Sequence, residues 1–459
     1  MKNTPHDFTR GGIAGPLIRF AIPVLAALFL QAMYGAVDLL VVGQFADKAD
    51  VSAVATGAHI MMTLTNLVAS LAMGATLLLG QQIGEGNAER GGATIGACIA
   101  LFGSIGLAMT LVTVPGAGLL ATVMRAPAHD LTAAYIRICG TGMLVIIAYN
   151  LIGSVFRGIG DSVTPLITVA IACAVNIAGD LLLVAVLHLG AAGAAIATVA
   201  AQAVSVTVSL LLARKKQLPF RLERQHICFN KPLMGQVIRF GLPIALSDLL
   251  VSISFLVIQA IVNALGVVPS AGVGVAEKVC AFIMLVPSAF SQAMSAFVAQ
   301  NAGAGKYDRA VRSLYCGVGL SLAVGAVMSW LSICHGPLLA GIFSGDREVI
   351  AAATDYLKAY GIDCLLTPIF FCAIGFFNGL GRTRFVMAQG IISAFCVRVP
   401  VSYLMSRRVP VSLFWIGMAT PFSSMLQIAM CTWYFLALRR QGLLRPGSGS
   451  GGNPPPQGA

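Results

Sequence analysis

The sequence predicts an all-α polytopic membrane protein, whose twelve transmembrane helices form two six-helix bundles related by pseudo-symmetry. Three observations lead to this prediction. The 459 residues are 58% hydrophobic and only 10% charged, whereas soluble domains carry about 25% charged residues. Apolar stretches of about 20 residues, the length that crosses a bilayer, recur along the whole chain. The two halves of the chain also repeat the same short motifs.

Twelve apolar segments have the length of a membrane span: 16–43, 51–79, 93–114, 130–156, 163–188, 191–213, 234–264, 272–299, 310–333, 349–377, 384–405 and 411–438. Their connections are short, except for residues 214–233, which carry six Lys and Arg side chains. We therefore expect five parts, which are an N-terminal segment 1–15, a first lobe 16–213, a basic linker 214–233, a second lobe 234–438 and a disordered tail 439–459.

The distribution of basic residues predicts the orientation in the membrane. With twelve spans, both termini lie on the same side as the basic linker. Outside the spans, that side carries 16 Lys and Arg residues and the other side carries five. Cytoplasmic loops are the richer in Lys and Arg, so we expect the termini and the linker in the cytoplasm. The same loops account for the net charge of +12, and no nucleic-acid partner is expected.

Three motifs recur at nearly equal offsets in the two halves. The matched segments are Arg19–Pro23 with Arg239–Pro243 (offset 220), Gln81–Gly86 with Gln300–Gly305 (offset 219), and Phe156–Ser162 with Phe377–Thr383 (offset 221). Because an even number of spans separates the copies, the two six-helix halves have the same orientation. Parallel repeats of this kind are typical of transporters that work by alternating access. The alternative is a structural duplication in a channel or a membrane enzyme.

The first span contains an acid, Asp38, within the apolar run Ala36–Leu40. A carboxylate at membrane depth is costly, and for that reason it usually marks a functional site. At about 1.5 Å per helical residue, Asp38 lies roughly 8 Å from the outer end of its span. Asp38 is therefore a candidate for a functional residue in the outer half of the membrane.

Four more polar side chains reach the same outer half of the first lobe. Asn176 and Asp180 stand one turn apart on the fifth span, while Thr198 and Tyr135 lie on the sixth and fourth spans. Such oxygen groups suit Na⁺, or a proton shared between carboxylates. We expect ion coupling at these four and Asp38. For Na⁺ the ligands would be Asp38, Asp180, Asn176 and Thr198. The alternative is that the two acids are structural carboxylates, held by hydrogen bonds near the interface.

The second lobe keeps only the phenol of this set, because Tyr356 aligns with Tyr135. The other matched positions hold Ile258, Arg398 and Ser402, in place of Asp38, Asn176 and Asp180. The sequence therefore predicts that ion coupling belongs to the first lobe.

Four polar residues of the second lobe are candidates for a substrate cavity: Asp248, Gln259, Asp363 and Arg398. Acids in such a cavity would attract a cationic substrate. Intramembrane charges usually pair with one another, so we expect Arg398 to pair with Asp355 or Asp363, or to extend to the interface.

Proline occupies matching places in the first and seventh spans, at Pro23 and Pro243. A mid-helix proline removes a backbone hydrogen bond and kinks the helix. Pro23 precedes Asp38 by about four turns, so a bend at Pro23 could respond to the protonation of Asp38. The alternative is a static kink, which membrane helices tolerate.

Five motifs in this order resemble the multidrug and toxic compound extrusion (MATE) family over nearly the whole chain. They are Pro23 with Ala36–Asp38, Gln81–Gly86, Phe156–Asp161, Asn176–Asp180 and Gly190–Thr198. The resemblance implies a two-lobed, V-shaped transporter in the bacterial inner membrane, which exchanges external Na⁺ or H⁺ for organic cations. No cofactor is implied beyond the coupling ion.

Within the family, the sequence looks like the DinF branch of prokaryotic transporters. That resemblance assigns coupling roles to Asp38, Tyr135, Asn176, Asp180 and Thr198. The other bacterial branch carries a glutamate in the seventh helix, where this chain has Val251, with Asp248 almost one turn earlier.

We therefore expect a monomeric antiporter, surrounded by membrane lipid, that exports cationic amphipathic compounds and is not an enzyme. Two alternatives remain open at this point. A flippase for lipid-linked saccharides shares the architecture but would need a strongly cationic cavity. An intramembrane enzyme could use the paired aspartates.

Overall fold

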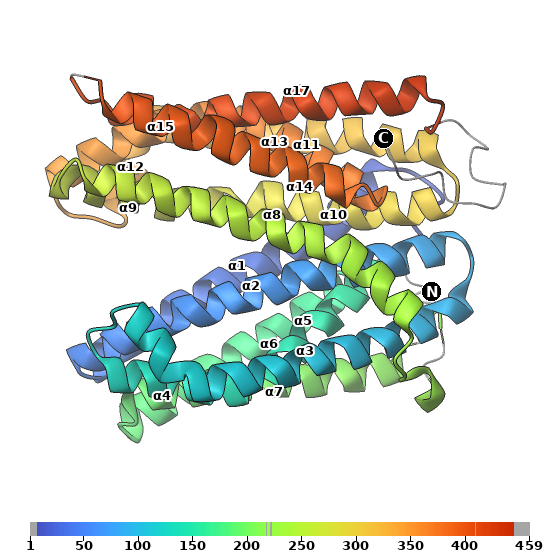
Figure 1. The fold of residues 1–459 in the computed structure, drawn as a ribbon, viewed down its shortest axis with the longest axis horizontal. Helices are drawn as coiled ribbons and strands as arrows, with labels where there is room; N and C mark the ends of the chain where they lie inside the picture. The colour runs from blue at the N-terminus through green and yellow to red at the C-terminus, as the bar shows by residue number, and fades with distance from the viewer. Residues whose placement is uncertain (1–6, 217, 221–222, 409, 445–459) are drawn as a thin grey trace. The chain divides into compact units, whose positions relative to one another are not determined.

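Every secondary-structure element is a helix in the computed structural model, which describes residues 7–216, 218–220, 223–408 and 410–444 (Figure 1). Within these residues, eleven helices are long and apolar enough to cross a membrane, and two shorter helices joined at a 55° bend make a twelfth if counted as one span. Helices satisfy their own backbone hydrogen bonds, which the bilayer core requires. The predicted tail 439–459 lies outside the described residues from position 445 onward.

The helices follow the predicted spans in order. They are α1 (Ala14–Phe45), α2 (Lys48–Gly84), α3 (Ala88–Val123), α4 (His129–Thr141), α5 (Met143–Gly158), α6 (Val163–Asp180), α7 (Gly190–Lys215), α8 (Lys231–Asn263), α9 (Val267–Ile283), α10 (Leu285–Gly303), α11 (Tyr307–Cys334), α12 (Gly336–Gly341), α13 (Arg347–Gly379), α14 (Thr383–Ile392), α15 (Val399–Ser406), α16 (Leu413–Gly417) and α17 (Ala419–Arg440). Two π-helical segments, η1 (Leu181–Val186) and η3 (Ser393–Arg398), and the 3₁₀ turn η2 (Arg224–His226) complete the set.

The fourth predicted span, 130–156, is not one continuous helix. α4 and α5 meet at Gly142 and differ in direction by 55°. A Cβ atom at Gly142 would lie 2.5 Å from the side chain of Val199 on α7, so glycine lets the bend pack closely against that helix. An apolar pattern predicts the span but not this bend, because the reason for it lies on another helix.

Packing divides the chain into two compact units. The described part of unit 1 comprises Arg19–Leu79 and Ala88–Leu246, and that of unit 2 comprises Asp7–Ile18, Gly80–Asn87 and the chain from Ser247 onward. In unit 1, α7 packs against α4, α5 and α6, and in unit 2, α13 packs against α9, α10, α11 and α17. The predicted lobes 16–213 and 234–438 stay a prediction.

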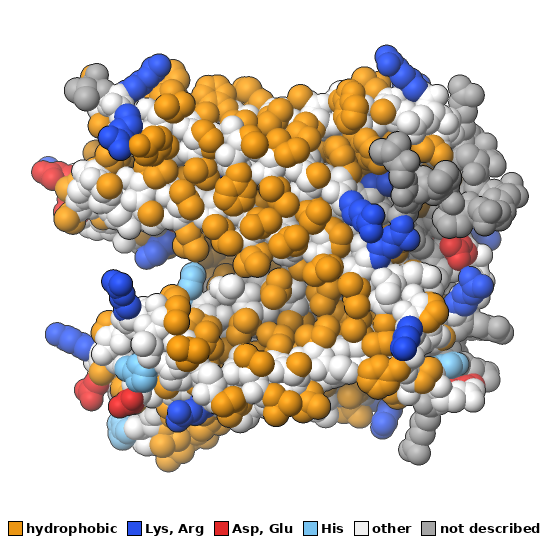
Figure 2. Space-filling model, in the orientation of Figure 1, with side chains coloured by type: hydrophobic (Ala, Val, Ile, Leu, Met, Phe, Trp, Pro, Cys, Tyr) orange, Lys and Arg blue, Asp and Glu red, His pale blue; other side chains and the backbone are white. Residues whose placement is uncertain are grey.

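Hydrophobic side chains cover the middle of the helices on the face that Figure 2 displays, whereas Lys and Arg gather near the helix ends. Many of the exposed side chains are large and apolar, such as Leu107, Leu111 and Trp433. This pattern is that of helices surrounded by lipid, with basic residues at the membrane boundaries.

The segment Asp7–Gly12, which we term the N-terminal strap, folds onto the turn between α10 and α11 in unit 2. Phe8 is only 1% exposed, and its ring stacks on Phe297 with centroids 5.2 Å apart. Arg309 donates hydrogen bonds of 2.7–2.9 Å to four carbonyl groups of the strap. Lys306 donates a 2.9 Å bond to a fifth. The predicted N-terminal segment 1–15 therefore contains a folded element.

Two glycines let α2 and α10 touch backbone to backbone within unit 2. A Cβ atom at Gly84 would overlap the carbonyl group of Gln300, and one at Gly303 would overlap that of Gln81. These positions are counterparts in the internal repeat, so each copy of the motif packs on the other. Small residues at helix crossings allow such close approach in membranes.

Asp161 joins three segments at one end of unit 1. Its carboxylate accepts hydrogen bonds from the backbone N–H groups of Val163 and Thr164 at 3.1 and 3.0 Å, which caps α6. Lys216, just after α7, forms a 2.6 Å ion pair with it. Burial alone would raise the pKa of Asp161, but the hydrogen bonds from Lys216 and Thr164 outweigh it and hold the pKa below its ordinary 3.8.

Replacing Asp161 by Ala will lower the stability of the protein by about 1–2 kcal/mol, the usual effect of losing a cap. The lowered pKa means that this contribution is complete above pH 3.8, and is lost as the pH falls through the folded value. Thermal unfolding in detergent at neutral and acidic pH measures both effects. Lys216→Met is the matched control and should cost less, because it leaves the cap intact. Equal melting temperatures for wild type and Asp161→Ala would contradict the assignment.

Candidate functional site

Asp38 and Asp180, from α1 and the end of α6, face each other inside unit 1. They are 4% and 0% exposed, and each carboxyl group acts electrostatically on the other. Both oxygens of Asp180 and Oδ1 of Asp38 are buried without a donor. Two ionised carboxylates can only accept hydrogen bonds, so a shared proton or a bound cation would stabilise this pair.

Asn176 and Thr198 bring further oxygen atoms to the pair. Asn176 lies one turn before Asp180 on α6, is fully buried, and has no partner for either amide atom. Thr198 stands on the neighbouring α7, and its buried hydroxyl also lacks a partner. A Cβ atom at Gly179 would lie 3.0 Å from that of Ala197, so small residues let α6 and α7 approach here.

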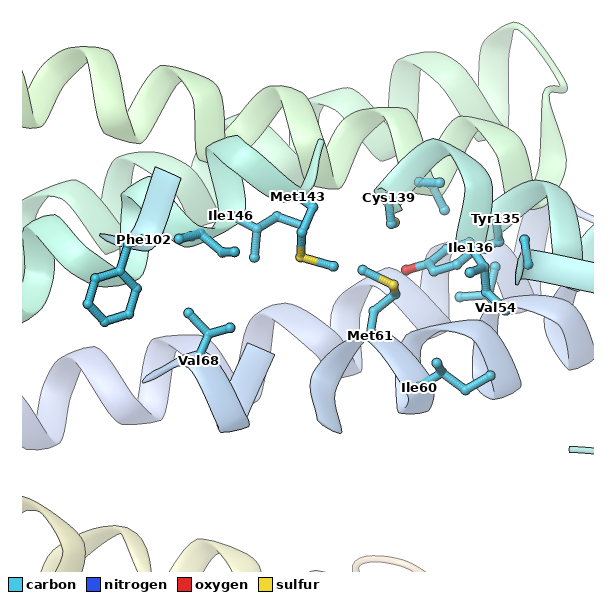
Figure 3. Close-up of a cluster of buried hydrophobic side chains, with 14 of the residues drawn as sticks. Val54, Ile60, Met61, Val68, Phe102, Tyr135, Ile136, Cys139, Met143 and Ile146 are labelled. Carbon is cyan, nitrogen blue, oxygen red and sulfur yellow. The ribbon is translucent and has the colours of Figure 1, made fainter. Parts of the chain in front are cut away.

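Tyr135 closes the site from α4 and is 2% exposed. Its ring packs over Gly57, where an added Cβ atom would lie 2.5 Å from it. Figure 3 shows Tyr135 and Cys139, from α4, across from Val54 and Met61 of α2. The structure therefore brings together all five residues predicted for ion coupling. We call Asp38, Tyr135, Asn176, Asp180 and Thr198 the Asp38 cluster.

Three more polar side chains belong with the Asp38 cluster and were missed in the sequence. Tyr34 lies within electrostatic range of both acids and beside Thr198. Cys139 neighbours Tyr135 and Asp38. The buried Gln202 Oε1 has no partner. Each residue stands four positions from a predicted one on the same helix, so the i, i+4 rule could have found them.

The helix that carries Asp180 changes form directly after it. α6 ends at Asp180, and the π-helical η1 begins at Leu181. Single π-helical turns inside α-helices are frequent at functional sites. The predicted span 163–188 thus contains a local widening of the helix that its apolar pattern did not reveal.

The donor atoms of the Asp38 cluster indicate what it can bind. Among the residues that the structure describes, no basic side chain acts electrostatically on the two acids. Within the described chain, no three His, Cys, Asp or Glu residues are placed to hold a metal ion. Carboxylate, amide and hydroxyl oxygens suit a hard monovalent cation or a proton rather than a transition metal.

The four candidates for a substrate cavity occupy different environments in unit 2. Asp248 is exposed on α8, and the half-buried Gln259 donates a 2.8 Å hydrogen bond to Asn263. Asp363 and Arg398 are 2% and 4% exposed and lie within electrostatic range of each other.

Two of the expectations for Arg398 are wrong. It does not extend to the interface, because it is buried and its guanidinium stacks 4.5 Å over the Phe255 ring. Asp355 pairs with Lys358 instead, at 3.1 Å. Among the described residues no acid lies within 4 Å of the Arg398 guanidinium, so Asp363 acts on it without direct contact.

Glu277 on α9 is a further buried acid, which is not among the predicted site residues. Its Oε1 atom is buried and has no hydrogen-bond partner, and it lies within electrostatic range of Tyr356. The signal was present, because Glu277 is an acid inside a predicted span, as Asp38 is.

Comparison with known proteins identifies a family and relatives that match this chain. The MatE family model matches residues 23–182 and 243–404, which are corresponding parts of the two halves. The probable multidrug resistance protein YoeA of Bacillus subtilis is 25% identical over 92% of this chain and 94% of that protein. The multidrug export protein MepA of Staphylococcus aureus is 20% identical over 87% and 89%.

A solved structure has the same fold. The crystal structure of MATE in complex with MaD3S superimposes with a TM-score of 0.89, covering 96% of this chain and all of that one at 18% identity. The agreement confirms the predicted fold of about twelve spans.

Proposed function

The chain belongs to the MatE family of transporters, and from this premise we propose that it is a DinF-like antiporter that exports cationic amphipathic compounds in exchange for H⁺ or Na⁺. The family is one of transporters, which sets aside the intramembrane enzyme. The names of the relatives as multidrug resistance and multidrug export proteins support drug-like compounds as cargo.

The observation that carries the proposal is the buried acid pair in the Asp38 cluster. Asp38 and Asp180 face each other without a basic partner, and three of their oxygens have no donor. A pair of this kind is stable only when it takes up a positive charge. Asn176 and Thr198 offer the additional oxygens that a Na⁺ ion would need. The coupling ion is therefore H⁺ or Na⁺.

The position of Asp38 on α1 supplies a route from ion binding to movement. α1 contains Pro23 on the same helix, about four turns before Asp38. Neutralisation of the acid pair removes the repulsion between α1 and α6. α1 then shifts, bending at Pro23, where one backbone hydrogen bond is missing. The shift weakens the cargo site, so ion entry from outside expels the cargo.

The remaining assignments belong to the same proposal. The chain acts as a monomer in contact with membrane lipid in the bacterial inner membrane, with both termini and the basic linker in the cytoplasm. The excess of Lys and Arg on that side supports this orientation. Buried acids favour cationic cargo over the pyrophosphate of a lipid-linked saccharide.

Uptake of a fluorescent cation into proteoliposomes, under separate Na⁺ and pH gradients, tests the proposal. We expect one of the two gradients to drive uptake above that of protein-free vesicles, and uptake to stop when the gradient is collapsed. We expect this because the Asp38 cluster must release its ion before the transporter can bind cargo again. Transport that only follows the cargo's own gradient would indicate a channel and contradict the proposal.

A further inference from the structure

Unit 2 contains a buried polar cluster at the positions that correspond to the Asp38 cluster and its neighbours. At offsets of 220–222, its members Ser254, Tyr356, Tyr360, Arg398, Ser402, Thr420 and Ser424 match Tyr34, Tyr135, Cys139, Asn176, Asp180, Thr198 and Gln202. All seven are at most 6% exposed. The counterpart of Asp38 is Ile258. Unit 2 thus has a buried polar cluster at the corresponding positions, but it lacks the two acids.

Arg398 is the one charged member of this counterpart cluster. Its guanidinium donates a 3.3 Å hydrogen bond to Ser254 and stacks on Phe255, both on α8. Its Nε atom is buried without a partner. The hydroxyls of Ser402, Thr420 and Ser424 also lack partners. The other members of the cluster carry only neutral hydroxyl or phenol groups, so none of them compensates the charge. A buried cation of this kind requires an anion nearby.

Asp363 is the anion. It lies two turns after Tyr356 on α13, is 2% exposed, and is held by a 2.9 Å hydrogen bond from Thr367. Its other oxygen has no donor. The charges of Arg398 and Asp363 act on each other, although the groups do not touch.

We propose that Arg398 is a covalently tethered cation, which takes in unit 2 the role that the coupling ion takes in unit 1. Because the guanidinium cannot leave, Arg398 and Asp363 balance each other's charge throughout the cycle, and the counterpart cluster binds no coupling ion. Arg398 is therefore the residue that confines ion coupling to unit 1. This inference rests on the proposed function for its account of unit 1.

Replacing Arg398 by a neutral residue should turn Asp363 into an acid that binds an ion. In Arg398→Gln the buried Asp363 has no cation, so it takes up a proton or Na⁺. Besides Arg398, the ionisable groups within electrostatic range of Asp363 are Tyr356 and Tyr360 on its own helix, Cys364 beside it, and Cys280 on α9. Glu277, also on α9, lies near Cys280 and Tyr356. None of these carries a positive charge that could replace Arg398.

Proton titration of the purified full-length protein tests the proposal, in choline chloride and in NaCl. Over about pH 9 to pH 5, above the range of ordinary carboxyl groups, Arg398→Gln should bind one more proton per molecule than wild type. If Na⁺ binds in place of that proton, the additional proton will be seen in choline chloride but not in NaCl. The double variant Arg398→Gln with Asp363→Asn should return to the wild-type number, as should the charge-conserving Arg398→Lys.

An unchanged proton number in Arg398→Gln, or an extra proton that persists in the double variant, would overturn the proposal. If Arg398→Gln does not fold, the double variant and Arg398→Lys decide, since both keep the site balanced and must transport with wild-type ion dependence. Asp38→Asn is titrated in parallel. A wild-type titration in that variant, together with the extra proton in Arg398→Gln, would refute the proposed coupling site but not the tethered cation.

Discussion

Asp38→Asn will abolish gradient-driven export and leave the protein folded. The substitution keeps the size of the side chain but removes the charge that the coupling ion must neutralise. Asp180 then faces an amide that can donate a hydrogen bond to it, so the pair no longer needs a proton or Na⁺. Transport of a fluorescent cation in proteoliposomes should fall to the level of protein-free vesicles, while the gel-filtration profile is unchanged.

Asp47→Asn is the matched control for this experiment. Asp47 is an exposed acid in the turn that follows the same helix, and its replacement should leave transport at the wild-type rate. If Asp38→Asn exports its cargo at full rate under an ion gradient, the Asp38 cluster does not couple the ion. If both variants lose transport, a general loss of negative charge at that end of α1 would be the better explanation.

Gly84→Val will prevent the stable folding of unit 2. The new side chain would overlap the backbone of α10 at Gln300, and a backbone cannot move aside as a flexible side chain can. Overpacking a well-packed contact typically costs about 1–3 kcal/mol, and sometimes more. Backbone overlap belongs at the upper end of that range. Melting temperature in detergent, and the yield of monodisperse protein, measure the effect.

The counterpart glycine in the internal repeat provides a second test of the contact between α2 and α10. Gly303→Val should be equally harmful, because Gly303 packs on Gln81 as Gly84 packs on Gln300. Gly319→Val on α11 is the control, since a Cβ atom there meets nothing within 4 Å. Normal stability of either crossing variant would contradict the direct backbone contact between α2 and α10.

Most of the fold could be predicted because each span carries its own signal. A run of about 20 apolar residues must be helical in a bilayer, and all twelve predicted spans correspond to helices. The bend at Gly142 and the π-helical turn after Asp180 could not be predicted in this way. Both depend on contacts with neighbouring helices, such as that of Gly142 with Val199. The apolar pattern of a single segment does not predict such contacts.

The candidate site was predictable to the extent that burial of polar groups is costly. That cost singles out Asp38 and Asp180 in any apolar span, and helical spacing adds Asn176 to Asp180. The environment of Arg398 could not be predicted, because its stacking on Phe255 depends on how η3 meets α8. Glu277 carries the same signal as Asp38, because it is an acid inside a predicted span.

The N-terminal strap has a consequence for the order in which the chain is synthesised and folded. The backbone N–H of Phe8 donates a hydrogen bond to Gln300, 292 residues later in the chain, and the carbonyl of Phe8 accepts one from Arg309, 301 residues later. At about 5–20 residues per second, a ribosome needs about 15–60 s to make the intervening chain. The first described residues to leave the ribosome are therefore among the last to reach their final contacts. A tag fused ahead of Phe8 would wait exposed for the same time.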